Sequence, residues 1–364
     1  MTAGAAAYVF ILNRLLIQVR DRRFKSLMVR AGGLSAAGIG ALIGWLSAGS
    51  RWSALPVATL VVTCIGEIRR LALRARHRGS APVAEDGPRA ALSRPNTTTD
   101  LVVKRYEVEV PAWGGPPIRV AHLSDLHLNG HLPLSYYEDA LRRVAESAPD
   151  LLFMTGDFVT RPEYTSLLPA VLGLAAGRLG SFAVLGNHDA WADAPLVAET
   201  VASTGVHMMG GKEIRIPVCD GHTIAVHGYE HPWSDGAGPG AGGEDRIPVS
   251  RNGDLTFLLT HTPDNIYRMQ GLGFDGVFAG HYHGGQIRVP GLGPLVIPSK
   301  YGRLLDRGHF VFGGSHLFVT SGVGSAEPPV RLWCQPDVII VDFLPGMKKG
   351  AEVQPATPPA AGGR

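Results

Sequence analysis

Five short motifs combine aspartate, histidine and asparagine, and each of them directly follows an apolar segment. Short apolar runs bounded in this way are typical of buried strands. In open α/β sheets, side chains at the carboxyl ends of the strands point into one shared crevice. We therefore expect the motifs to converge on one site. They contribute Asp125 and His127, Asp157, Asn187 with His188 and Asp189, His261, and His281 with His283.

Carboxylate, imidazole and amide oxygen ligands together suit a first-row divalent metal, whereas an all-oxygen set would favour magnesium or calcium. The seven candidate ligands are too many for one ion. Two ions about 3.5–4 Å apart can clamp both sides of a phosphoryl displacement and activate a water held between them. Such a pair needs a bridging carboxylate, and Asp157 is the candidate. The predicted ligands are Asp125, His127, Asp157, Asn187, His261, His281 and His283.

The elements that must position these residues are short β-type runs that alternate with helical patterns, which predicts an α/β fold. We expect helices over Ser135–Ser147, Ala194–Ser203 and Pro263–Gln270. The expected strands are Lys104–Val110, Ile118–Leu123, Leu151–Met154, Ser181–Leu185, Thr223–His227, Leu255–Leu259, Gly276–Ala279, Leu317–Thr320 and Val338–Phe343.

The motif series DxH, GD, GNHD, H and GHxH, in this order, resembles the calcineurin-like metallophosphoesterase family over residues 118–345. The resemblance implies a four-layer α/β/β/α sandwich with helices outside two sheets. It also implies the division of the ligands. One metal would be held by Asp125, His127, Asp157 and His283, and the other by the same Asp157 with Asn187, His261 and His281.

His188 is not among the ligands that the resemblance implies. In the family, this position contacts the phosphoryl group and can protonate the leaving oxygen. Asp189, the next residue, is expected to orient the His188 ring. Tyr282 stands where the family often has a small polar residue, which affects the expected substrate contacts and not the ligands.

The residues after the last ligands leave alternatives open. Gln286 would either hydrogen-bond a bound phosphate or have no role, and Gly284 and Gly285 would serve a phosphate contact or only a turn. Four basic residues follow, and they would engage a diphosphate or remain solvated surface charges. They are Arg288, Lys300, Arg303 and Arg307.

The N-terminal residues 1–76 are predicted to be a membrane anchor. Residues 31–49 are uncharged over 19 positions, close to the length of a membrane-spanning helix. A second, shorter apolar run predicts another span at about 53–68, and residues 5–19 are expected to lie in the interface. The alternative is that 31–66 is a buried hairpin of a soluble protein.

Charge distribution sets the expected orientation, because Lys and Arg are retained on the cytoplasmic side. Six basic residues precede position 31, one lies between the two runs, and five lie between 69 and 78. Both ends, and with them the catalytic domain, should face the cytoplasm at the inner membrane. The alternative is that Arg22-Arg23 belongs to a twin-arginine export signal.

Composition divides the remaining chain. Residues 77–100 and 347–364 are poor in large apolar residues and are expected to be a flexible linker and a disordered tail. The metallophosphoesterase domain should span 101–346. His231–Asp245 is Gly-rich and predicts a mobile surface loop.

The basic residues are concentrated next to the predicted membrane segments. This distribution does not indicate a nucleic-acid partner. Three widely spaced cysteines predict free thiols.

The motif GHYHGGQIRVPG, with PSKYGR following, is similar to a bacterial membrane-associated or exported branch of the family. That branch includes lipid-handling phosphodiesterases and UDP-2,3-diacylglucosamine pyrophosphatases. We therefore expect a lipid-linked phosphoester substrate at the membrane, with two Mn²⁺ ions, or Zn²⁺ or Fe²⁺, as cofactors. The alternatives are a broad phosphodiesterase or phospholipid hydrolase, and a metal-binding membrane scaffold without turnover.

Overall fold

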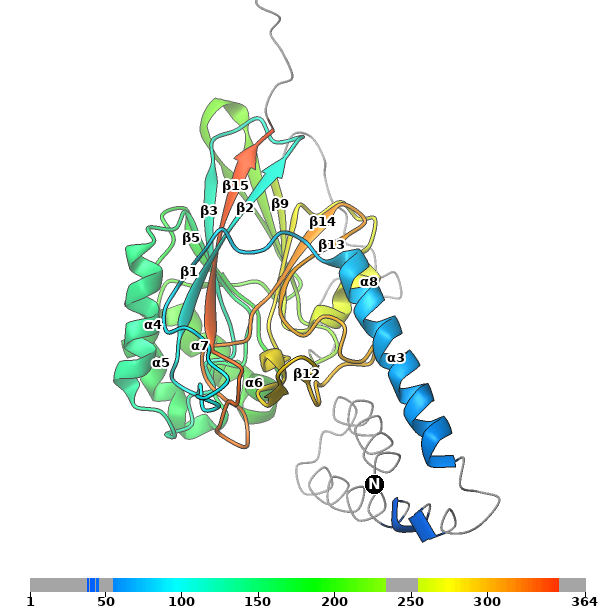
Figure 1. Cartoon of the computed structure of the whole chain (residues 1–364). Coiled ribbons are helices and arrows are strands. Elements are labelled where there is room, and N and C mark those ends of the chain that lie inside the picture. Colours follow the sequence, from blue (N-terminus) through cyan, green and yellow to red (C-terminus); the bar gives the residue numbers. More distant parts are fainter. Residues whose placement is uncertain (1–37, 39, 43, 46–54, 234–254, 347–364) are drawn as a thin grey trace, which may run out of the picture.

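The first of two sheets has seven strands in the order β1-β2-β15-β3-β4-β5-β6. The computed structural model describes residues 38, 40–42, 44–45, 55–233 and 255–346 (Figure 1). The neighbours β3, β4, β5 and β6 run parallel, and β15 lies between β2 and β3. The strands are β1 Ala84–Asp86, β2 Val102–Val110, β3 Ile118–Leu123, β4 Leu151–Met154, β5 Gly180–Ala183, β6 His207–Met208 and β15 Asp337–Pro345.

The second sheet has six strands in the order β13-β14-β10-β9-β8-β7. Its inner strands β8, β9, β10 and β14 are parallel, and the edge strands β7 and β13 are antiparallel to their neighbours. The strands are β7 Glu213–Pro217, β8 Thr223–Tyr229, β9 Leu255–Thr260, β10 Gly276–Ala279, β13 Gly308–Phe312 and β14 Ser315–Val319. A separate two-stranded hairpin pairs β11 Arg288–Val289 with β12 Gly293–Pro294.

The two sheets face each other and are flanked by helices (Figure 1), as expected for the fold class. Phenylalanines from both sheets, such as Phe153 and Phe278 with ring centroids 5.0 Å apart, fill the space between them. The helices α4 Leu134–Glu146, α5 Leu168–Leu172 and α7 Ala194–Ser203 cover the outer face of the first sheet. The short α8 Ile266–Met269 packs against the second sheet.

The helix α4 shows why these segments dock. Its buried residues Tyr137, Ala140, Leu141 and Val144 follow the spacing of one helical face and belong to the core on the first sheet. The strands β4 and β10 are buried at every position, as the short apolar runs predict for strands covered on both faces.

The helix α3 Leu55–His77 projects from the domain (Figure 1). It begins close to the expected second span, but it is longer and carries Glu67, Arg69 and Arg70 in its second half. No helix in the part of the chain that the structure describes is long and apolar enough to cross a membrane. The expected span at 53–68 is therefore not supported, and most of 31–49, the interfacial segment 5–19 and the tail 347–364 lie outside the described residues.

The expected linker 77–100 differs from the structure, because it contains regular structure and backbone pairing. The strand β1 pairs antiparallel with β2, and Asn96 forms a bridge with Leu332. The N–H of Trp333 also donates to the carbonyl of Pro95 at 2.7 Å. Composition did not reveal this pairing, because backbone hydrogen bonds do not require apolar side chains.

Candidate metal centre

The five motifs follow the carboxyl ends of five strands, and the structure brings all of them together. Asp125 and His127 follow β3, Asp157 follows β4, and Asn187 starts the helix α6 Asn187–Ala192 after β5. His261 follows β9, and His281 and His283 follow β10. Each of the seven side chains is at least nine-tenths buried. Both sheets therefore contribute ligands to one polar site, as the strand-end argument predicts.

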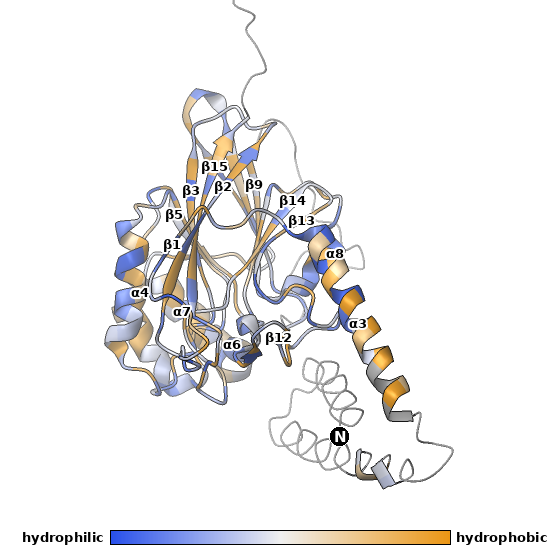
Figure 2. Ribbon diagram, viewed as in Figure 1, coloured by the Kyte–Doolittle hydropathy of each residue, from blue (hydrophilic) through white to orange (hydrophobic). Residues whose placement is uncertain are grey.

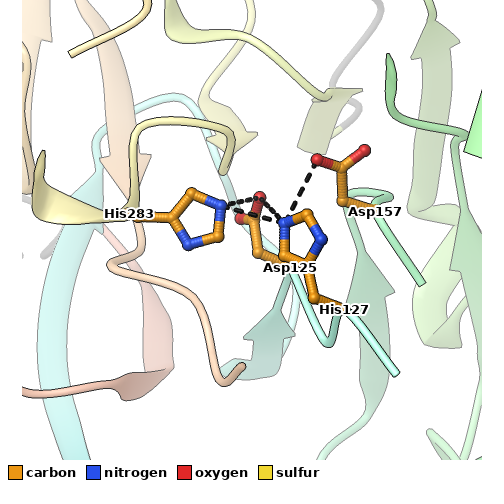
Figure 3. Close-up of side chains that lie close together, drawn as sticks. All are labelled: Asp125, His127, Asp157 and His283. Atoms are coloured by element: carbon orange, nitrogen blue, oxygen red, sulfur yellow. Dashed lines mark hydrogen bonds and ion pairs between the residues drawn. The ribbon is translucent and has the colours of Figure 1, made fainter. Parts of the chain in front are cut away.

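One group of side chains joins Asp125, His127, Asp157 and His283, with one ligand atom from each lying within 4.8 Å of the others. Figure 3 shows these four side chains turned toward one another. Nε2 of His127 lies 3.0 Å from Nε2 of His283 and 3.4 Å from Oδ2 of Asp157. Nε2 of His283 lies 3.2 Å from Oδ1 of Asp125. These four residues can hold one metal ion.

A second group joins Asp157 to His261 and His281 under the same distance limit. Nε2 of His261 lies 3.3 Å from Oδ2 of Asp157, 3.1 Å from Nδ1 of His281 and 3.1 Å from Oδ1 of Asn187. Asp157 is therefore common to both groups, and Asn187 supplies an oxygen to the second. The cluster fits a dinuclear metal site.

Hydrogen bonds on the far side of the histidine rings fix which nitrogen faces the cluster. Nδ1 of His261 lies 2.6 Å from the carbonyl oxygen of Thr155, which can only accept a hydrogen bond, so Nδ1 carries a proton. Nδ1 of His127 is bonded to Oγ1 of Thr160 at 3.1 Å. In the neutral His261 ring, this arrangement leaves the Nε2 lone pair for a metal.

The backbone of the candidate ligands is held in an unusual conformation. Five of the nine described non-glycine residues with positive φ belong to the predicted ligand set. Such conformations cost about 1–3 kcal/mol each and concentrate at functional sites. The five are Asp125 (54°), His127 (45°), Asp157 (55°), His281 (69°) and His283 (51°).

Two glycines permit the close packing of the ligand loops. A Cβ atom at Gly186 would clash with Oδ1 of Asp157, and one at Gly280 would clash with the side chains of Ser124 and Asp125. Both glycines directly precede ligands, so their lack of a side chain lets two strand ends approach the carboxylates.

The electrostatics of the site favour bound positive charge. Burial alone would raise the pKa of Asp125 and Asp157, but neighbouring histidines lower both. Burial lowers the pKa of His127 and His281 well below the usual value. Burial also acts to lower the pKa of His261, but attraction to Asp157 prevails and raises it to about 9. A protonated His261 thus partly offsets the carboxylates when no metal is bound.

Asp189 does not have the expected role. Its carboxylate accepts backbone N–H groups from Asp157 at 2.7 Å, Phe158 at 2.8 Å, Val159 at 3.2 Å and Gly186 at 3.0 Å. These bonds hold the loop after β4, whereas the expectation was that Asp189 orients the imidazole of His188. Asp189 is therefore a positioning residue for the Asp157 loop.

His188 lies beside the cluster, as its place in the motif predicts. Its backbone N–H donates to Oδ1 of Asp157 at 2.7 Å, and its ring centroid is 4.6 Å from that of His127. The ring of Trp191 also contacts the His188 ring, with centroids 5.0 Å apart. Packing against Trp191, which the sequence reasoning did not single out, therefore takes the place of the expected carboxylate contact.

Trp233 was also missed. Its ring centroid lies 4.9 Å from that of His281 and 5.4 Å from that of His261, so it covers the second group. It falls in the segment expected as a mobile surface loop, most of which lies outside the described residues. The sequence feature that could have identified Trp233 is its position as a bulky aromatic residue inside that Gly-rich segment.

Several residues within and after the GHYH motif have contacts that explain them without a substrate. The Gln286 amide receives the N–H of Ala326 at 2.6 Å and donates to the carbonyl of Pro328 at 2.9 Å. Tyr282 is buried and donates to Asp264. Arg288 and Arg303 make contacts with Asp306 and with Glu67 of α3, respectively. These residues anchor loops around the GHYH motif.

Two facing sheets with a buried Asp/His cluster at their strand ends define a metal-dependent phosphoesterase architecture. A family model for calcineurin-like phosphoesterases matches residues 118–285. Phosphodiesterase YaeI of Escherichia coli is 30% identical over 233 residues, 63% of this chain and 83% of the relative. The chain belongs to the calcineurin-like phosphoesterase family.

Two other relatives extend the comparison. The metallophosphoesterase YkuE of Bacillus subtilis is 27% identical over 236 residues, covering 61% of this chain and 77% of the relative. UDP-2,3-diacylglucosamine pyrophosphatase LpxG of Chlamydia trachomatis is 25% identical over 286 residues, covering 62% and 84%. Family and relatives together make this chain a metal-dependent phosphoester hydrolase.

Proposed function

We propose that the protein is a membrane-associated dinuclear phosphohydrolase that cleaves a phosphodiester or pyrophosphate bond of a lipid-linked substrate such as UDP-2,3-diacylglucosamine. The proposal of two metal ions is supported by one observation, that Asp157 belongs to both ligand groups. A carboxylate shared in this way would let Asp157 serve two ions, and such a pair would supply the chemistry that phosphoryl displacement uses.

One ion would be held by Asp125, His127, Asp157 and His283, and the other by Asp157, Asn187, His261 and His281. Imidazole and carboxylate ligands in this mixture suit Mn²⁺, which we propose as the physiological metal, with Zn²⁺ and Fe²⁺ as competitors. When bound, the two ions polarise the phosphoryl oxygens and lower the pKa of a bound water.

The protein residues supply position and a proton. His188 lies against His127 and its backbone is fixed by Asp157, so its imidazole is held at the edge of the cluster. From there it contacts the phosphoryl group and donates a proton to the leaving oxygen. Trp191 restricts the His188 ring. Asp189 keeps the Asp157 loop in the strained conformation that the ligand requires.

The substrate class follows from two kinds of support. The LpxG relatives are named as UDP-2,3-diacylglucosamine pyrophosphatases, and they match 84% of their length at 25% and 27% identity. In addition, the first half of α3 exposes apolar side chains: Val57 is 63% exposed, Val62 69% and Ile65 60%. Figure 2 shows hydrophobic residues along the ribbon of the helix that projects from the domain. An exposed apolar surface of this kind suits contact with lipid.

We place the catalytic domain on the cytoplasmic face of the inner membrane, anchored by the N-terminal region. The support is the uncharged stretch 31–49 and the basic residues on its flanks. A reporter fused after residue 346, active only in the cytoplasm or only in the periplasm, tests the orientation. A periplasmic signal would favour the twin-arginine alternative.

A substrate comparison tests the activity. Purified full-length protein with Mn²⁺ should release UMP from UDP-2,3-diacylglucosamine and lose this activity in EDTA. Turnover of soluble diesters without any turnover of the lipid substrate would contradict the proposal of a lipid-linked substrate. It would favour a broad phosphodiesterase, the second candidate, which the name of the YaeI relative supports. Metal binding without hydrolysis of any ester would instead indicate a scaffold.

A further inference from the structure

A cavity of about 400 Å³ lies between the second half of α3 and the β11–β12 hairpin. Its charged lining consists of Arg70 and Arg74 from α3, Arg288 and Arg307 from the domain, and one carboxylate, Asp306. The seven candidate metal ligands do not line it, so the cavity is distinct from the metal centre. We call it the arginine pocket.

The pocket has an excess of positive charge. The four guanidinium groups face the Asp306 carboxylate in the lining, and Arg70 also pairs with Glu67 at 2.9 Å, so two positive charges remain in excess. Asp306 is shared, because it pairs with both Arg74 and Arg288. Burial acts to lower the pKa of Arg307, but attraction to Cys334, Asp306, Asp337 and Glu85 prevails and raises it. Burial lowers the pKa of Arg74; attraction to Asp306 opposes this shift, and repulsion from Arg288, Arg70 and Arg307 adds to it.

Attachment of α3 explains only part of this arrangement. Arg70 donates to the carbonyl of Leu292 at 3.0 Å, and Arg74 donates to that of Leu304 at 2.7 Å. Uncharged side chains in place of Arg70 and Arg74 could donate the same hydrogen bonds to these carbonyls without adding repulsion between positive charges. An anion seated among the four guanidinium groups would relieve that repulsion, and arginine binds phosphate through paired N–H donors.

The surroundings of the pocket favour an amphiphilic anion. Leu92, Leu292 and Val289 line it and remain exposed, at 73%, 39% and 38%. On α3, Ile65 lies five residues before Arg70, about 7.5 Å along the helix axis. A membrane that takes up the apolar first half of α3 would therefore bring its phosphate groups to the level of Arg70 and Arg74.

We propose that the arginine pocket binds the phosphate group of an anionic membrane lipid. The proposal rests on the membrane association proposed above and not on the hydrolytic activity. A phosphomonoester carries about −1.5 to −2 charges near neutral pH, which approaches the excess positive charge of the pocket. Binding there would hold α3 and the β11–β12 hairpin together at the lipid surface.

The test measures thermal unfolding of the full-length, Mn²⁺-loaded protein in uncharged detergent. The probes are dihexanoyl phosphatidic acid, dihexanoyl phosphatidylcholine and inorganic phosphate at equal concentration. Phosphatidic acid should raise the Tm by about 3 °C more than phosphatidylcholine does, because a ligand that binds the folded state stabilises it. Inorganic phosphate should give a smaller shift, since it lacks the apolar part.

Two pocket variants, Arg307→Gln and Arg70→Gln, should each lose most of the shift. Arg142→Gln is the matched control, because Arg142 pairs with Glu138 on the exposed face of α4. Hydrolysis of bis(p-nitrophenyl) phosphate serves as the folding control, and phosphate bound at the metal centre contributes equally to all four proteins. Equal shifts in wild type and both pocket variants would overturn the proposal. An inorganic-phosphate shift as large as that of phosphatidic acid would overturn the lipid assignment.

The assay separates this proposal from the proposed function. The thermal shift requires neither turnover nor insertion into a bilayer, because the probes are soluble short-chain lipids. Loss of hydrolysis with a retained shift would contradict the proposed function alone. Retained hydrolysis of UDP-2,3-diacylglucosamine with no difference among the variants would contradict the arginine pocket alone.

Discussion

Asp189 accepts a hydrogen bond from the backbone N–H of Asp157 at 2.7 Å, and both carboxylates are fully or almost fully buried. Asp157 is the residue common to the two ligand groups, and its φ of 55° lies in the left-handed region. The bonds from Asp189 to the backbone therefore hold the shared ligand in a conformation that an aspartate seldom adopts.

Replacing Asp189 by Asn should weaken metal binding. An amide retains one acceptor oxygen but turns an NH₂ group toward backbone donors, so part of the network is lost. Loss of a partner that orients a ligand typically lowers metal affinity by roughly 10–100-fold. Titration of the metal-free variant with Mn²⁺ measures this change.

The matched control for that variant is Asp193→Asn. Asp193 caps α7 by accepting the N–H of Leu196 at 3.1 Å and contacts no candidate ligand in the described structure. Substitution there should leave Mn²⁺ affinity unchanged. Equal loss of affinity in the two variants would show that the Asp189 effect reflects general destabilisation.

His188→Ala should reduce hydrolysis by about 10²–10⁴-fold while two ions remain bound, because proton donation to the leaving oxygen is lost. The loss should be smaller for p-nitrophenyl esters, whose leaving group needs no proton, than for alkyl esters. Rate constants for both esters, with metal content by mass spectrometry, check this. A uniform loss across leaving groups would contradict the proton-donor role.

Metal binding should be coupled to proton release. The attraction of Asp157 raises the pKa of His261 to about 9 in the metal-free protein. At lower pH, an entering metal must displace that proton, so affinity should fall by about tenfold for each unit of pH below 9. Calorimetry in two buffers of different ionisation enthalpy counts the protons released. A pH-independent affinity between pH 6 and 8 would contradict this coupling.

Trp233→Ala should raise KM more than it lowers kcat, since Trp233 covers His261 and His281 without offering a metal ligand. The expected change in KM is about 3–10-fold, in line with about 0.5–1.5 kcal/mol for an aromatic contact. Trp233→Phe should restore most of it. Steady-state kinetics of the two variants measure KM and kcat. An unchanged KM in both variants would contradict a contact between Trp233 and the substrate.

The sequence predicted the strands that carry ligands more accurately than the edges of the sheets. The bounds of β3, β4 and β10 agree with expectation, because buried parallel strands appear as short uninterrupted apolar runs. The edge strands β1, β6, β7 and β13 were missed. The strands β1 and β6 have only three and two residues, and β7 is partly exposed, so their patterns are weak. The strand β13 is mostly buried, and its apolar run was overlooked.

The candidate ligands could be predicted because metal coordination restricts residue type and spacing. The supporting contacts could not. Asp189 contacts backbone groups about 30 positions away, and Trp191 and Trp233 act through ring packing that leaves no motif. The predicted span at 53–68 rested on the apolar first half of α3 and did not foresee that the charged second half docks on the domain through Arg70 and Arg74.

In the proposed mechanism, Asp157 joins two metal ions in one catalytic centre. Titration of metal-free protein with Mn²⁺, followed by electron paramagnetic resonance and by hydrolysis, tests it most directly. We predict two ions per chain with an exchange-coupled signal, hydrolysis that appears only as the second ion binds, and loss of both in Asp157→Asn. Full activity with one ion per chain and an uncoupled signal would contradict a dinuclear catalytic centre.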